Sequence, residues 1–124
     1  MELGGFRVIE QSRLDGAVIY VEADRQLFIT RIDTAILEDY FGRARIGDDP
    51  SRRMTKRECN LLATANLKLL APLIQAKVDA GDYGTIATEP HPVVELTLAD
   101  LQRSPTRLSD RILDFADRSG WTDT

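Results

Sequence analysis

The chain has little of what most enzyme sites are built from: 124 residues contain one cysteine, one histidine and 6% aromatic residues. A single cysteine excludes an internal disulfide and fits a reducing compartment. One cysteine and one histidine are too few for a zinc site within one chain, because such sites take three or four ligands. We therefore expect no metal, no cofactor and a cytoplasmic location.

Long apolar runs are also missing. The longest, such as residues 69–74, are far shorter than the roughly 20 residues that a membrane span needs. The N-terminus has no basic region followed by an apolar stretch and a small-residue cleavage site, which argues against secretion. With 43% hydrophobic and 29% charged residues, the composition predicts one globular domain over residues 1–124. We expect its core at about 12–101 and a C-terminal helical extension at 102–124.

The sequence lacks the glycine-rich motifs that bind phosphates or dinucleotides, and it lacks G-x-S-x-G. His91, between two prolines, fits a solvent-exposed loop better than a catalytic or metal-binding position. Cys59 fits a packing position at the start of a helix, with a reactive thiol beside basic residues as the alternative. The carboxylate pairs at 38–39 and 48–49 do not have the spacing of a metal loop. We predict no catalytic residue, and an enzyme with an unidentified site is the third alternative.

Two segments rich in β-branched and aromatic residues, 17–23 and 26–32, flank a two-residue polar turn. They predict a hairpin in which Val21 faces Phe28 and one face is apolar. The remaining predicted strands are an edge strand at 6–10 and a later strand at 93–96.

Four predicted helix starts share one pattern, an N-cap residue with an apolar residue before it and another five positions after that one. The four N-cap residues are Asp33, Thr55, Thr97 and Ser109. Thr55 and Glu58 complete a capping box, and Thr97 and Asp100 form a second one. The last of these helices is predicted over residues 110–118.

The helix that starts after Thr55 is predicted to run as one bent rod from Lys56 to about Ala80, where Gly81 ends it. Pro72 predicts a kink or a break in this helix near residues 68–72. Its apolar residues form two stripes, whereas a small sheet covers only one. The second stripe packs within the chain or forms the interface of a homodimer. The sequence thus predicts an α+β fold, with a small antiparallel sheet on a long kinked helix and short flanking helices.

The order of these features resembles a family of small bacterial proteins catalogued as domain of unknown function 1488. The resemblance rests on the hydrophobic patterns of residues 17–21, 29–42 and 95–101 and covers roughly 12–101. It implies the fold just described and a bacterial origin. It brings no activity, substrate or catalytic residue.

One stretch is strongly basic. Residues 42–58 hold six of the sixteen basic residues and three of the twenty acidic ones, so they carry +3 while the rest of the chain carries −7. Cations in the first turn of a helix oppose its dipole, so these residues pair with acidic groups or meet an external anion. Arginine suits phosphate and carboxylate. The candidate binding residues are Arg43, Arg45, Arg52, Arg53, Lys56 and Arg57.

From these patterns we favour a non-catalytic protein that acts through protein association, as a homodimer or with an acidic protein partner. The alternative is binding of an anion or a nucleic acid through the arginine-rich loop, residues 43–57. Nucleic acid is not favoured, because no aromatic residue interleaves the basic ones to stack on bases. A solvated or salt-bridged loop is the interpretation that assigns this stretch no function.

Overall fold

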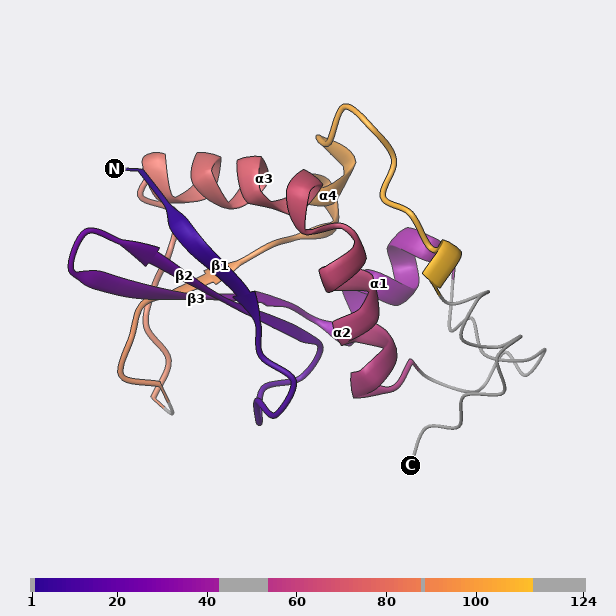
Figure 1. Cartoon of the computed structure of the whole chain (residues 1–124), viewed down its shortest axis with the longest axis horizontal. Helices are drawn as coiled ribbons and strands as arrows, with labels where there is room; N and C mark the ends of the chain where they lie inside the picture. The colour runs from indigo at the N-terminus through magenta and orange to yellow at the C-terminus, as the bar shows by residue number, and fades with distance from the viewer. Residues whose placement is uncertain (1, 43–53, 88, 113–124) are drawn as a thin grey trace.

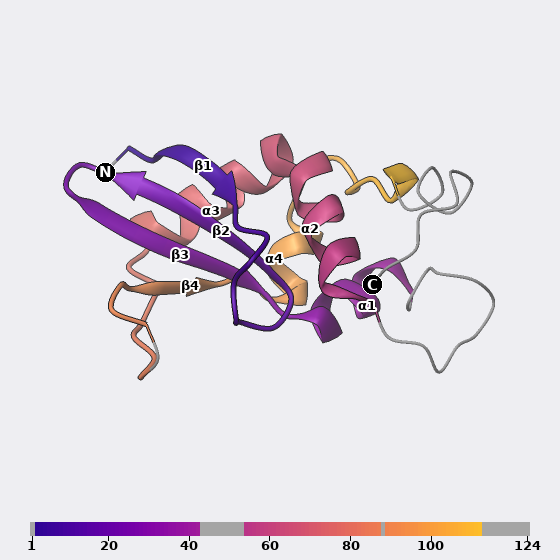
Figure 2. The same cartoon turned by 60° about the horizontal axis from the view of Figure 1, so that its bottom comes forward.

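The computed structural model of the chain describes residues 2–42, 54–87 and 89–112. Its elements are β1 (Gly4–Val8), β2 (Ala17–Ala23), β3 (Gln26–Ile32), α1 (Thr34–Phe41), α2 (Lys56–Ala65), α3 (Leu67–Asp79), β4 (Val93–Glu95) and α4 (Leu98–Gln102). The strands form one sheet in the order β1-β2-β3-β4, and the described helices all lie to one side of it or beyond its end (Figures 1 and 2). The predicted α+β fold is confirmed.

The predicted hairpin is confirmed residue by residue. β2 and β3 pair antiparallel with Val21 opposite Phe28 and Ala17 opposite Ile32, and Asp24 in the turn has a positive φ of 53°. The side chains that face the helices are fully buried, because α2 and α3 cover this face. They form the main core with residues from all four helices, among them Leu37, Leu62, Leu70, Ile74 and Leu101, and with Leu96 between β4 and α4.

The direction of the last strand differs from the prediction. β4 pairs parallel to β3, with Ile29 opposite Val93, so the sheet is mixed. The reason is the connection: three helices carry the chain from the end of β3 back to the end where β3 began. Such a crossover produces a parallel neighbour, whereas a short turn produces an antiparallel one.

The prediction of one kinked rod over residues 56–80 is wrong. The segment forms two helices, α2 and α3, that meet at 88°. The break lies at Asn66, whose side-chain nitrogen donates to the carbonyls of Leu62 and Ser109, each at 2.8 Å. Asparagine breaks helices in this way because its amide competes for backbone groups. Pro72 is exposed within α3, where water can reach the carbonyl that its missing N–H leaves unpaired.

The bend at Asn66 also removes the two-stripe argument for a dimer. Leu70, Ile74 and Val78 are buried, and Leu69 and Leu73 from the other stripe pack half-buried against the same core. Among the described residues, Tyr83 is the one large hydrophobic side chain that is exposed. Both stripes therefore pack within the chain.

The helix ends confirm most of the local predictions. Both capping boxes are present, at Thr55 with Glu58 and at Thr97 with Asp100. Gly81 has a φ of 70° and ends α3, with its N–H on the carbonyl of Val78. The start of α1 differs from the prediction.

Asp33 occupies the N-cap position of α1, but its side chain makes no cap hydrogen bond. The carboxylate of Asp15 takes that role from the loop before β2. It accepts from the backbone N–H of Thr34 at 3.2 Å and from its hydroxyl at 2.9 Å. Because Asp15 and Thr34 are 19 residues apart, the local sequence pattern at the start of α1 does not predict this cap.

A buried ion pair joins α3 to α4. The ammonium of Lys77 lies 3.0 Å from the carboxylate of Asp100 and 2.8 Å from that of Asp82. Desolvation raises the pKa of Asp100, but the hydrogen bonds from Thr97 and Lys77 outweigh it and hold the pKa below its usual value. Desolvation lowers the pKa of Lys77, and its hydrogen bonds to Asp82 and Asp100 outweigh that effect and raise it.

We expect Asp100→Asn to lower the free energy of unfolding by about 1.5–3 kcal/mol at pH 7, the range for hydrogen bonds to charged groups. Because the folded pKa of Asp100 is depressed, its contribution is present above the unfolded pKa, about 3.9, and is lost as the pH falls through the lower folded pKa. Urea unfolding of both proteins between pH 7 and pH 3 measures this. If the difference in unfolding free energy between the two proteins stays constant down to pH 3, the prediction is wrong.

Candidate functional site

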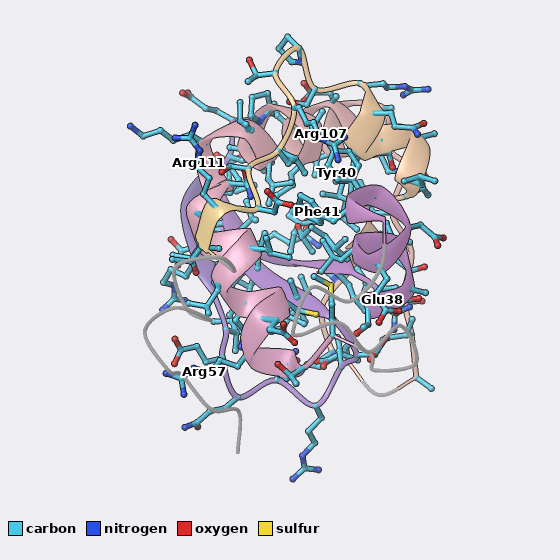
Figure 3. The ribbon with its side chains drawn as sticks, turned by 90° about the vertical axis from the view of Figure 1, so that its right-hand side faces the viewer. Glu38, Tyr40, Phe41, Arg57, Arg107 and Arg111 are labelled. Atoms are coloured by element: carbon cyan, nitrogen blue, oxygen red, sulfur yellow. The ribbon has the colours of Figure 1, made fainter. Side chains whose placement is uncertain are left out.

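One end of the molecule gathers the features that the sequence singled out. It is formed by α1, α2 and residues 104–112, which we call the strap (Figure 3). In the sequence, the arginine-rich residues 43–53 stand between α1 and α2, and they lie outside the described residues. Glu38 and Tyr40 come from α1, Arg57 from α2, and Arg107 and Arg111 from the strap.

Four of the six predicted binding residues, Arg43, Arg45, Arg52 and Arg53, lie outside the described residues. Lys56 is described, and its ammonium is engaged within the chain. It donates to the carbonyls of Leu14, at 2.9 Å, and of Gly16, at 2.5 Å, and desolvation lowers its pKa. Lys56 therefore ties the loop after β1 to α2, which explains a cation in the first turn of this helix. The predicted anion site itself stays a prediction.

Three exposed arginines are present at this end, from two elements far apart in the chain. Arg57 belongs to the predicted patch, whereas Arg107 and Arg111 were missed. The guanidinium of Arg107 lies over the ring of Tyr40, 4.8 Å from its centroid, and donates to the carbonyl of Tyr40 at 3.2 Å. This carbonyl is in the last turn of α1, where a cation is favourable. No local signal in the sequence points to this contact, because 67 residues separate its partners.

The strap lies across the junction of α1, α2 and α3. Its N–H at Leu108 donates to the hydroxyl of Tyr40 at 2.9 Å, and the Leu108 side chain is buried. Asn66 binds both backbone groups of Ser109, accepting from its N–H at 2.7 Å and donating to its carbonyl at 2.8 Å. Of the predicted last helix, 110–118, residues 111 and 112 are helical, and residues 113–118 lie outside the described residues.

Cys59 and His91 are the other chemical candidates. Cys59 is fully buried, with its sulfur 3.8 Å from the hydroxyl of Thr34. Desolvation raises the pKa of the thiol to about 11, so the thiol is protonated at neutral pH and the packing interpretation is confirmed. His91 lies in the loop before β4, as predicted, but it is half-buried and not solvent-exposed. In the part of the chain that the structure describes, no three His, Cys, Asp or Glu residues group as a metal site.

An open polar hollow of about 650 Å³ lies between α2 and the turn after β1. It is lined by Glu10, Gln11, Lys56, Arg57, Asn60, Leu61 and Thr64. Asn60 is 7% exposed, and its side-chain nitrogen lies 3.4 Å from the carbonyl of Glu10. The lining mixes one acidic and two basic side chains with neutral ones, so it favours no single ligand charge.

The face of the sheet opposite the helices carries a second apolar cluster, whose centre comes from β2, β3 and β4. Val18, Ile29 and Val93 are buried at its centre, and Ile9, Leu14, Tyr20 and Ile86 are only partly buried around them. Loops, and no described helix, cover this face. Arg31 forms ion pairs with Glu95 and Asp33 beside the cluster. The outer face thus has a small apolar centre bordered by charges of both signs.

Neither a protein family nor a curated protein nor a solved structure matches this chain. The resemblance to domain of unknown function 1488 therefore stays a prediction. Within the described ranges, no single helix is long and apolar enough to cross a membrane. α2 and α3 reach that length and composition only as a pair, which is bent by 88°.

Proposed function

We propose that the protein is a non-catalytic binding protein that acts by association, first of all with a second copy of itself. The observation that carries this proposal is the outer face of the sheet, where the partly buried side chains of Ile9, Leu14, Tyr20 and Ile86 surround a second apolar cluster that no described helix covers. A face with both signs of charge around an apolar centre suits a two-fold interface, because each copy can offer the charge that the other needs. The cytoplasmic and bacterial setting inferred from the sequence is part of the proposal.

The edges of the sheet are poorer candidates for this contact than its outer face. β1 carries an irregularity between Gly4 and Arg7, and Gly5 within it has a φ of 62°. Bulges and charged residues are devices that keep edge strands from pairing with other chains. β4 has three residues, and Gly84 bonds to Val93 at its outer side, at 2.7 and 3.0 Å. A dimer therefore meets face to face.

Light scattering coupled to gel filtration should give about twice the chain mass of 13.9 kDa. We expect Tyr20→Lys to weaken the dimer at least about tenfold, because it places a charge in a desolvated contact. Gln102→Lys, at an exposed position of α4, is the matched control and should leave the mass unchanged. A wild-type monomer at every concentration, or a Tyr20→Lys dimer as tight as the wild type, contradicts the proposal.

A second candidate function is binding of an anion or a nucleic acid at the arginine end. The exposed side chains of Arg57, Arg107 and Arg111 on one end favour it (Figure 3). We expect affinity for nucleic acid to fall steeply with salt, and the variant with Arg57→Glu and Arg111→Glu to bind at least about tenfold more weakly. Titrations of nucleic acid at three salt concentrations test this. The candidate function is ruled out if the affinity changes neither with salt nor with the double substitution.

A further inference from the structure

The polar hollow between α2 and the turn after β1 is bordered by a buried amide that lacks a donor. The side-chain oxygen of Asn60 is buried and accepts no hydrogen bond from any residue that the structure describes. The nitrogen of the same amide lies 3.4 Å from the carbonyl of Glu10. Nearly all buried polar groups in native proteins have a partner in the protein, in water or in a ligand. Because Asn60 lines the hollow, a ligand with a donor group can supply this hydrogen bond.

The hollow has the size of a small-molecule site. Its volume of about 650 Å³ falls within the roughly 300–1,000 Å³ that is usual for such sites. One wall is a single face of α2, because its residues recur at spacings of three and four: Arg57, Asn60, Leu61 and Thr64. The turn after β1 forms the opposite wall, with the exposed side chain of Glu10. A ligand in the hollow therefore contacts two elements that the fold holds together.

The two ends of the hollow differ in charge. Lys56 and Arg57 belong to the first turn of α2, where the helix dipole adds to their positive charge. Acceptors line the hollow from the next turn onward. The hydroxyl of Thr64 donates to the carbonyl of Asn60 at 2.8 Å, so its lone pairs are what it offers a ligand. The unpaired oxygen of Asn60 is the second acceptor, and Glu10, whose carbonyl lies beside Asn60, adds a carboxylate.

We propose that the hollow binds an α-amino acid as a zwitterion. Its ammonium group has three N–H donors, which bond to Asn60, Thr64 and Glu10, and its carboxylate lies at the positive end beside Arg57. A simple cation would be repelled at the positive end, and a simple anion would give the oxygen of Asn60 no donor. The proposal does not depend on the dimer, because no residue that lines the hollow belongs to the apolar cluster of the outer face.

The test uses the full-length chain and each common L-amino acid in turn, first by saturation-transfer difference NMR and then by calorimetric titration of those that bind. We expect at least one of them to bind. Its N-acetyl derivative, which has no ammonium group, and its amide, which has no carboxylate, should each bind at least about tenfold more weakly. If no amino acid binds, or if the N-acetyl derivative binds as tightly as the amino acid, the proposal is wrong.

Glu10→Gln and Arg57→Gln change the two ends of the hollow separately, and both side chains are exposed. Each substitution should weaken binding of the amino acid at least about tenfold. Glu22→Gln and Arg25→Gln are the matched controls, because they remove the same charges at exposed positions outside the lining, and they should leave the affinity unchanged. Affinity that falls with Arg57→Gln but not with Glu10→Gln would show an anion site, and would overturn the assignment to a zwitterion.

Asn60→Leu tests the buried acceptor itself. It replaces the unpaired oxygen with apolar atoms of similar size, and we expect it to weaken binding at least about tenfold. Circular dichroism checks that this variant is folded, and the exposed substitutions at Glu10 and Arg57 decide the question if it is not. A folded Asn60→Leu chain that binds the amino acid as tightly as the wild type overturns the proposal.

Discussion

Replacing Gly16 with alanine is expected to destabilise the fold by about 3–5 kcal/mol. Gly16 stands before β2 with a φ of 80°, and a Cβ there would lie 1.9 Å from the carbonyl oxygen of Ile32 and 2.8 Å from the nitrogen of Thr34. The left-handed conformation alone costs an alanine roughly 1–2 kcal/mol. The rest is the cost of moving the end of β3 away from β2, at the position where Ala17 pairs with Ile32.

The expected loss of unfolding free energy is large because several contacts depend on the position of Gly16. The carbonyl of Gly16 accepts from the ammonium of Lys56, and its neighbour Asp15 caps α1 through Thr34. A shift of Gly16 therefore disturbs the sheet and two helices together. Guanidinium unfolding followed by circular dichroism measures the change.

Gly81→Ala is the matched control for Gly16→Ala. Gly81 has a φ of 70°, and a Cβ there meets nothing within 4 Å. Its loss should be only the roughly 1–2 kcal/mol of left-handed strain. If the two alanine variants lose the same free energy, the close approach of Gly16 to Ile32 does not carry the effect.

The parts of this fold that follow from the sequence are those whose causes lie close together in it. The hairpin register needs only alternating side chains and a two-residue turn, and the capping box of Thr55 needs Glu58 three residues later. The glycine that ends α3 is equally local. The residues that determine each of these features lie within the feature itself or next to it in the sequence.

The features that could not be predicted from the sequence depend on contacts between residues that are far apart along the chain. Pro72 was the more obvious candidate for a break, yet the chain turns at Asn66, because that amide binds Ser109, 43 residues further on. At the candidate site, Lys56 fits the composition of an anion patch, and only its contacts with Leu14 and Gly16 reveal a structural role.

The largest effect outside Gly16 is expected at this corner, from Asn66→Asp. The side-chain nitrogen of Asn66 donates to the carbonyls of Leu62 and Ser109, and a carboxylate of the same size would turn an acceptor toward both oxygens. Asn66 is 3% exposed, so water cannot relieve the repulsion. We expect the free energy of unfolding at pH 7 to fall by about 3–5 kcal/mol, as for a buried charge that faces two carbonyl oxygens and keeps the N–H of Ser109 as a donor.

Asn66→Ala separates the charge from the lost hydrogen bonds. It removes the same contacts without placing a carboxylate, and we expect a loss of about 2–3 kcal/mol. The aspartate variant should recover toward the alanine value as the pH falls toward the ordinary pKa of aspartate, about 3.9, because a protonated carboxyl can again donate. Urea unfolding of the three proteins at pH 7 and pH 4 measures both effects. If aspartate is tolerated as well as alanine at pH 7, the amide donor does not hold the corner between α2 and α3, and the turn must come from the packing of Leu62 and Leu70 around it.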